Sequence, residues 1–192
     1  MDTVWKLPLE EFARRVAAGP TPAGVSVSAV TASFALNLLA MSLDVSARRR
    51  DFAADSDRCR ALADAARIEA SQMMKYADDD IAAYQAYLKN RKSPNADAAL
   101  REAVEVPLKI ARVAIRGLEL CAKGSSFVSA RVAPDLNSAA ALLAAVIRAA
   151  IRSAEANAAA STDRGLLRQI ISERSRLESE AEALVDKILG TI

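Results

Sequence analysis

One uncharged stretch constrains this chain more than any other feature. Between Val25 and Leu43, about 19 residues pass without a charged side chain, which is long enough for a helix to cross a bilayer. A helix that is apolar on every side is also typical of the buried centre of a helical bundle. Serines and an asparagine dilute this stretch, and its alanines offer little side chain to lipid but let other helices approach closely. Burial inside the protein is therefore favoured, and we expect no membrane association.

The composition predicts an all-α protein without a sheet. Hydrophobic residues make up 52% of the sequence but aromatic residues only 4%, so alanine, the best helix former, supplies much of the apolar content. A chain of 192 residues is long enough to bury a sizeable core in one domain. We expect a single domain over residues 1–192, folded as an up-and-down bundle of long helices with apolar central helices.

The absence of histidine and the placement of cysteine exclude several kinds of site. Without histidine, Ser-His-Asp and Cys-His nucleophilic sites and most zinc sites are ruled out. Cys59 and Cys121 match no metal spacing, so we expect buried free thiols. Basic and acidic residues are interleaved, with only Arg48–Arg50 as a basic run. We expect no metal, no cofactor and no nucleic-acid partner, and a cytoplasmic location because nothing suggests export.

Apolar periodicity and turn residues divide the chain into six expected helices. Their ranges are 1–19, 22 or 26 to 47, 51–90, 93 or 95 to 123, 134–160, and 162 or 163 to 189. Thr21 and Pro22 are expected to cap and begin the second helix, and Pro107 to kink or break the fourth. The sixth has one densely charged face, so it covers the bundle from outside or packs on a partner subunit. Asp78–Asp80 is most simply a solvated face of the third helix.

Several motifs in these helices resemble one enzyme family. Pro20–Ala29 (PTPAGVSVSA) resembles the PTPGGGS-V-A signature of the formiminotetrahydrofolate cyclodeaminase and methenyltetrahydrofolate cyclohydrolase family. Ala77–Tyr84 (ADDDIAAY) resembles its acidic Asp-x-x-Ala-Phe/Tyr segment, and Val106–Leu108 its Val-Pro-Leu. Asp135 and Asn157 fall where the family has a Ser-Asp pair and a late Asn. The resemblance covers nearly the whole chain and implies an enzyme of one-carbon folate metabolism.

Other positions depart from the family pattern. One glycine of three survives in Ala23–Val25, and Asp44–Ser46 stands where members usually carry Asn-Leu-Thr. A lysine-rich run appears as Arg48–Phe52, and Ser129 and Ser153 replace residues that are often Asn. Only glycine adopts positive φ freely and lets backbone approach a ligand closely. The chain therefore resembles a diverged member of this family.

Two aspartates are the candidate catalytic residues. By resemblance, the substrates are folates bridged or substituted at N5 and N10, and 5,10-methenyltetrahydrofolate carries a cationic amidinium carbon. Its hydrolysis to 10-formyltetrahydrofolate needs a carboxylate that stabilises the cation and accepts a proton from water. Asp80 is the first candidate because it best matches the family's acidic position, and Asp135 is the second. The alternatives are a solvated Asp80 and an Asp135 that caps a helix.

The candidate folate-binding residues are Gly24, Ser26, Asp44, Arg49, Arg50 and Asn157. The first two lie at a helix start, whose backbone N–H groups can meet anionic groups. The arginines can clamp the glutamate tail of folate. Asn157 contacts either the ligand or a neighbouring helix. Asp44 opposes the helix dipole, so either Arg48 or Arg49 compensates its charge or it acts in the pocket.

The resemblance leaves two reactions open, together with a role that involves no catalysis. A cyclohydrolase hydrolyses the methenyl bridge, whereas a cyclodeaminase expels ammonia from a formimino group and closes the ring. The 192 residues include no formiminotransferase domain, which slightly favours the cyclohydrolase. The lost glycines motivate the alternative, a catalytically silent or repurposed folate-binding helical bundle. We also expect a homodimer, because family members associate through long helices and the apolar faces exceed what one bundle hides.

Overall fold

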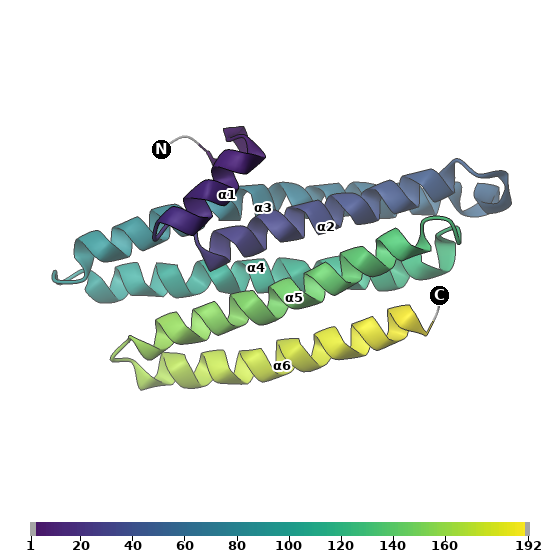
Figure 1. Ribbon diagram of the computed structural model, residues 1–192. Coiled ribbons are helices and arrows are strands. Elements are labelled where there is room, and N and C mark those ends of the chain that lie inside the picture. Colours follow the sequence, from purple (N-terminus) through teal and green to yellow (C-terminus); the bar gives the residue numbers. More distant parts are fainter. Residues whose placement is uncertain (1–2, 191–192) are drawn as a thin grey trace.

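Four long antiparallel helices form the centre of the protein. The computed structural model describes residues 3–190 and contains no strand among them. The central helices are α2 (Gly24–Ala47), α3 (Ser56–Asn90), α4 (Ala96–Gly124) and α5 (Ala133–Ala159). Consecutive helices run in opposite directions, and α2 also packs against α5, which closes the bundle (Figure 1). The predicted all-α, up-and-down bundle is confirmed.

Two further helices and three short 3₁₀ turns complete the fold. The short helix α1 (Leu9–Ala18) lies across the outer side of α2 and α3, whereas α6 (Arg164–Leu189) packs along α4 and α5 (Figure 1). The 3₁₀ turns are η1 (Val4–Lys6), η2 (Arg50–Asp55) and η3 (Ser125–Phe127). The helix α6 buries one face and leaves its charged face outside, so it covers the bundle as expected.

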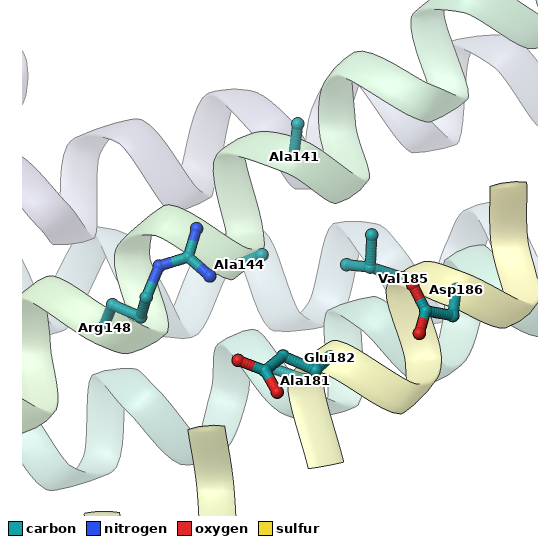
Figure 2. A pocket seen from close by; sticks show the side chains of 7 residues that line it. All are labelled: Ala141, Ala144, Arg148, Ala181, Glu182, Val185 and Asp186. Atoms are coloured by element: carbon teal, nitrogen blue, oxygen red, sulfur yellow. The ribbon is translucent and has the colours of Figure 1, made fainter. Parts of the chain in front are cut away.

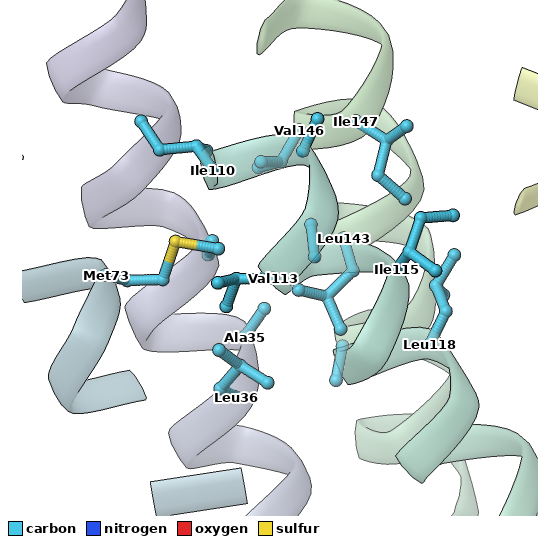
Figure 3. Close-up of a cluster of buried hydrophobic side chains, with 14 of the residues drawn as sticks. Ala35, Leu36, Met73, Ile110, Val113, Ile115, Leu118, Leu143, Val146 and Ile147 are labelled. Carbon is cyan, nitrogen blue, oxygen red and sulfur yellow. The ribbon is translucent and has the colours of Figure 1, made fainter. Parts of the chain in front are cut away.

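The hydrophobic core runs through the middle of the four central helices. In Figure 3, Leu36 of α2, Met73 of α3, Ile110 of α4 and Leu143 of α5 converge, and all four side chains are fully buried. Each such side chain contributes roughly 1.5–3 kcal/mol on burial. A Cβ added at Gly117 would lie 2.9 Å from Leu36 Cδ2 and 3.0 Å from Leu143 Cδ1, so a larger residue there would require these leucine side chains to shift. The core is therefore built from aliphatic side chains between closely spaced helices.

The helix α2, which contains the uncharged stretch from Val25 to Leu43, is the core helix that its sequence predicts. By length and composition it could span a membrane, yet α3, α4 and α5 cover most of its surface. Three of its buried serines donate a hydroxyl hydrogen bond to the backbone carbonyl four residues earlier: Ser28 to Gly24, Ser42 to Leu38 and Ser46 to Ser42. This burial agrees with the prediction that α2 lies inside the helical bundle.

Three local predictions differ from the structure. The helix α2 begins at Gly24 with Ala23 at its N-cap, so Thr21 does not cap it and Pro22 lies outside it. The third helix begins at Ser56 rather than at residue 51, because residues 50–55 form a 3₁₀ turn. The fourth helix continues through Pro107, so of the predicted kink or break the break does not occur. The reason for this continuity lies in the candidate site.

Candidate functional site

A cavity of about 380 Å³ lies where α2 begins, between α3 and α5. This volume is typical of small-molecule sites. Its walls come from the loop before α2 and the first turn of α2, from the C-terminal third of α3 and from the last turns of α5. The lining residues are Pro20, Thr21, Ala23, Gly24, Val25, Asp80, Tyr84, Ser153, Ala156 and Asn157. Three of the predicted site residues, Gly24, Asp80 and Asn157, therefore face one cavity.

Among the residues that the structure describes, Asp80 is the only charged one that lines this cavity, and Ser26 holds it there. The Ser26 hydroxyl donates a hydrogen bond of 2.6 Å to Asp80 Oδ2. Unlike the other bonded serines of α2, Ser26 uses its hydroxyl to contact another helix rather than its own carbonyls. Its backbone N–H belongs to the first turn of α2, where the amide groups lack partners within the helix. Ser26 thus fixes the carboxylate at the positive end of the α2 dipole.

Burial makes Asp80 an unusually weak acid. Desolvation raises the pKa of Asp80, and the hydroxyl and backbone N–H of Ser26 lower it by less. Between residues 3 and 190, no cationic side chain contributes to the pKa shift of Asp80. A half-buried carboxylate without a counter-ion attracts a cation and also accepts a proton more readily than an exposed aspartate. Both properties suit a group that works on a cationic carbon.

Asn157 explains why α4 continues through its proline. Pro107 has no N–H, so the carbonyl of Ala103, four residues earlier, loses its usual helical partner. The side-chain amide of Asn157 donates a hydrogen bond of 2.7 Å to this carbonyl. Of the two alternatives for Asn157, the helix–helix hydrogen bond is therefore present, and Asn157 also lines the cavity. This bond ties α5 to α4 at the cavity.

Gly24 contributes open space rather than an unusual backbone conformation. A Cβ built on Gly24 would meet no atom within 4 Å, and no residue between 3 and 190 has a positive φ. Ala23 has φ −130°, which any residue adopts. Alanine and valine in place of the family's glycines therefore impose no backbone strain on this turn.

Tyr84 and Ser153 are cavity residues that the sequence did not single out as site residues. Tyr84 follows Asp80 by one helical turn, so both side chains share one face of α3. This i, i+4 spacing was the signal that could have identified Tyr84. Ser153 donates its hydroxyl to the carbonyl of Ala149 at 3.0 Å, as exposed helical serines often do.

The other four predicted site residues lie at the opposite end of the bundle. Asp135 is in the first turn of α5, roughly 33 Å from Asn157 at about 1.5 Å per residue. Asp44 is near the end of α2, and Arg49 and Arg50 follow that helix. Within one chain, these residues therefore lie far from the Asp80 cavity. Their roles stay predictions.

At that end, the carboxylate of Asp44 is neutralised by a partner that the sequence did not suggest. Arg67 of α3 forms an ion pair with Asp44 and a second one, of 2.8 Å, with Asp64. Arg49 pairs instead with Asp51 at 2.7 Å, and both side chains are exposed. The compensation expected from Arg48 or Arg49 is therefore supplied by Arg67.

A second cavity, of about 390 Å³, lies between α5 and α6 but has different chemistry (Figure 2). Its lining includes three alanines and Val185, and Arg148 of α5 lies across from Glu182 and Asp186 of α6. Both signs of charge are therefore present, and no predicted site residue lines it. We favour the Asp80 cavity as the functional site.

The cysteines confirm the expectation of buried free thiols. Cys59 and Cys121 are both buried, and burial raises the pKa of Cys121 to about 12. Such thiols are poor nucleophiles at neutral pH. Within residues 3–190, no group of three or more Asp, Glu, Cys or His side chains is placed to hold a metal ion.

Comparisons with known proteins agree with the fold and the motifs. Residues 8–176 match the family described as formiminotransferase-cyclodeaminase. The crystal structure of a formiminotetrahydrofolate cyclodeaminase from Thermotoga maritima superposes with a TM-score of 0.92 and is 24% identical in sequence. The match covers 98% of this chain and 96% of that one. No curated protein matches.

Proposed function

We propose that this chain, which belongs to the formiminotransferase-cyclodeaminase family, is an enzyme that binds a tetrahydrofolate derivative in the Asp80 cavity. The family supports a role in one-carbon folate metabolism. The observation that carries the proposal is a cavity whose only charged group is a carboxylate without a counter-ion. Such a site favours a cationic ligand over a neutral or anionic one.

The reaction we propose is hydrolysis of 5,10-methenyltetrahydrofolate. Its amidinium carbon, between N5 and N10, is the cation that Asp80 would face. The carboxylate stabilises this positive charge in the bound substrate and accepts a proton from the attacking water. The carbinolamine that forms then opens: its hydroxyl proton is released to solvent as the formyl C=O forms, the N5–carbon bond breaks, and the proton held on Asp80 is returned to N5. The product is 10-formyltetrahydrofolate.

The raised pKa of Asp80 also suits the related cyclodeaminase reaction. In that reaction N10 attacks the formimino carbon, and ammonia leaves after it receives a proton. A carboxyl group that retains its proton more readily than an ordinary aspartate can supply it. We therefore keep the cyclodeaminase as the second candidate activity.

A spectroscopic assay separates these activities from a folate-binding protein without catalysis. The methenyl compound absorbs in the near ultraviolet, and at mildly acidic pH its spontaneous hydrolysis is slow. We expect the purified protein to accelerate the loss of this absorbance. A gain of absorbance from 5-formiminotetrahydrofolate, with release of ammonia, would identify the cyclodeaminase instead. Folate binding without either change would show a catalytically silent member.

We further propose that the protein acts in the cytoplasm as a homodimer. Phe34 and Met41 of α2 and Leu142 of α5 are exposed, and these two helices lie side by side (Figure 1). Large exposed apolar side chains on adjacent helices are typical of an interface between subunits. Two chains packed antiparallel across this face would bring the Asp135 end of one near the Asp80 cavity of the other. Light scattering at micromolar concentration tests the proposal: a dimer is expected, and a monomer would contradict it.

A further inference from the structure

Asp78 holds the N-terminal part of the chain against α3. We call residues Thr3 to Ala18 the N-terminal arm. The Thr3 hydroxyl donates to Asp78 Oδ2 at 2.6 Å, and the backbone N–H of Val4 donates to Asp78 Oδ1 at 2.9 Å. Both carboxylate oxygens are thus occupied by the arm. The side chain of Asp78 is half-buried, so the acidic run is not simply a solvated face.

The sole tryptophan of the chain reinforces this attachment. Trp5 donates its indole N–H to the carbonyl of Met74 at 2.8 Å, one turn before Asp78 on α3. Its ring meets Phe34 of α2 edge to face, with centroids 6.3 Å apart. In contrast, α1 contains no fully buried residue. The firm contacts of the arm are therefore concentrated at its first residues.

The arm leads directly into a wall of the candidate site. Residues 19–23 follow α1, and among them Pro20, Thr21 and Ala23 line the cavity. Asp78 lies only two residues before Asp80 on α3. One short stretch of α3 therefore has two roles. Asp78 binds the start of the arm, and Asp80 faces the cavity wall that follows the arm.

We propose that Asp78 is a positioning residue: it locks the N-terminal arm so that residues 19–23 stay in place as a wall of the Asp80 cavity. Asp78 does not line the cavity itself. An aspartate suits this role because its two oxygens accept from two donors at once. The nature of the substrate in this inference rests on the proposed function, whereas the locking of the arm does not.

The test compares Asp78→Ala with Asp79→Ala. Both substitutions remove one negative charge and one aspartate from adjacent positions of α3, but Asp79 makes no hydrogen bond or ion pair with any described residue. Because Trp5 is the only tryptophan, its emission reports the state of the arm. We expect a red shift for Asp78→Ala and faster amide hydrogen exchange at residues 19–25. Circular dichroism should show an unchanged bundle in both variants.

The kinetic consequence should be specific to substrate binding. Loss of two hydrogen bonds to a charged group should raise KM for the methenyl compound by about tenfold. The value of kcat should change little, because Asp80 and Ser26 are untouched. Asp78→Asn keeps one oxygen that can accept from Val4, so it should restore part of the effect.

Two results would overturn the inference. Trp5 emission and exchange at residues 19–25 that match Asp79→Ala would show that Asp78 does not lock the arm. A released arm with unchanged exchange at residues 19–25 would show that the arm does not hold the wall. If the wild-type chain turns over no folate, the proposed function fails, but the emission and exchange measurements still decide the role of Asp78.

Discussion

Two carboxylates, Asp44 of α2 and Asp80 of α3, lie near opposite ends of α2. Their comparison shows what separates a candidate catalytic group from a structural one. Asp44, near the C-terminal end, is neutralised by Arg67. Asp80, at the N-terminal end, is held by Ser26 and has no cationic partner. Both side chains are partly buried, so burial alone does not distinguish them. The difference is the counter-charge, which leaves only Asp80 available to a cationic substrate.

The largest expected effect is on catalysis, and only one of the two carboxylates should show it. Asp80→Asn should lower kcat/KM for the methenyl compound by roughly 10²–10⁴, the usual contribution of a general acid or base. Asp44→Asn should leave it within about threefold, because Asp44 lies roughly 30 Å away along α2. Steady-state rates of the two variants measure this contrast. Equal losses in both would remove the distinction between the two ends.

The order of the two variants should be reversed for stability: Asp80→Asn should not lower the free energy of unfolding, whereas Asp44→Asn should. The pKa of Asp80 is raised in the folded state, so its ionised form costs free energy of folding. This cost is present at pH values above the folded pKa and is relieved as the pH falls through it toward the unfolded value. Asp80→Asn should therefore unfold at the same or a higher urea concentration than wild type at neutral pH. A clear loss of stability would mean that the carboxylate is needed structurally.

The hydrogen bond from Asn157 should stabilise the fold because it replaces the helical bond that Pro107 cannot make to the Ala103 carbonyl. Asn157→Ala leaves the Ala103 carbonyl without a donor and should destabilise the fold by about 1–3 kcal/mol. In a Pro107→Ala background, residue 107 regains its N–H, and the same substitution should cost less. Urea unfolding of the four variants gives the coupling energy. Strictly additive effects would show that Asn157 does not compensate for the proline.

Ser26→Ala should shift the pH dependence of activity. The Ser26 hydroxyl lowers the pKa of Asp80, so its removal should raise that pKa further. If Asp80 acts as a base, the acid limb of the kcat/KM profile should move to higher pH, by up to about one unit. Profiles of wild type and Ser26→Ala between mildly acidic and neutral pH provide the test. A shift toward lower pH would contradict the assignment of Ser26.

The smallest expected effect concerns the ion pair at the other end. Asp44→Asn should cost about 0.2–1 kcal/mol of unfolding free energy, because Arg67 is largely exposed and solvent screens the pair. Arg67→Gln is the matched substitution from the other side of the ion pair and should cost a similar amount. If either variant loses several times more unfolding free energy in a urea titration, solvent does not screen this ion pair as assumed.

The sequence predicted the fold well because its signals are local. The uncharged run identifies α2 as a core helix, and the charged face of residues 164–189 identifies α6 as an outer one. The start of α3 was predicted too early, since residues 50–55 form a 3₁₀ turn that apolar spacing does not distinguish from an α-helix. Helix existence and type follow from periodicity, whereas helix ends depend on tertiary contacts.

The arrangement of the candidate site could be predicted from the sequence only in part, because it depends on contacts between distant residues. Asp80 was selected from Asp78–Asp80 by resemblance, but the hydrogen bonds of Asp78 to the N-terminal arm span more than 70 residues. Nothing local in the sequence links Asn157 to Ala103, and nothing local pairs Asp44 with Arg67. The division of the predicted residues between two ends of the bundle becomes visible only in three dimensions.

The most direct test of the difference between the two carboxylates is the titration of Asp80 itself. We would follow side-chain carboxyl carbons of ¹³C-aspartate-labelled protein by NMR and assign the resonance of Asp80 from its absence in Asp80→Asn. We predict a midpoint above the ordinary aspartate value of 3.8, which falls when a cationic folate analogue binds. A midpoint at or below that value, with no response to the analogue, would contradict an uncompensated carboxylate that meets a cationic substrate.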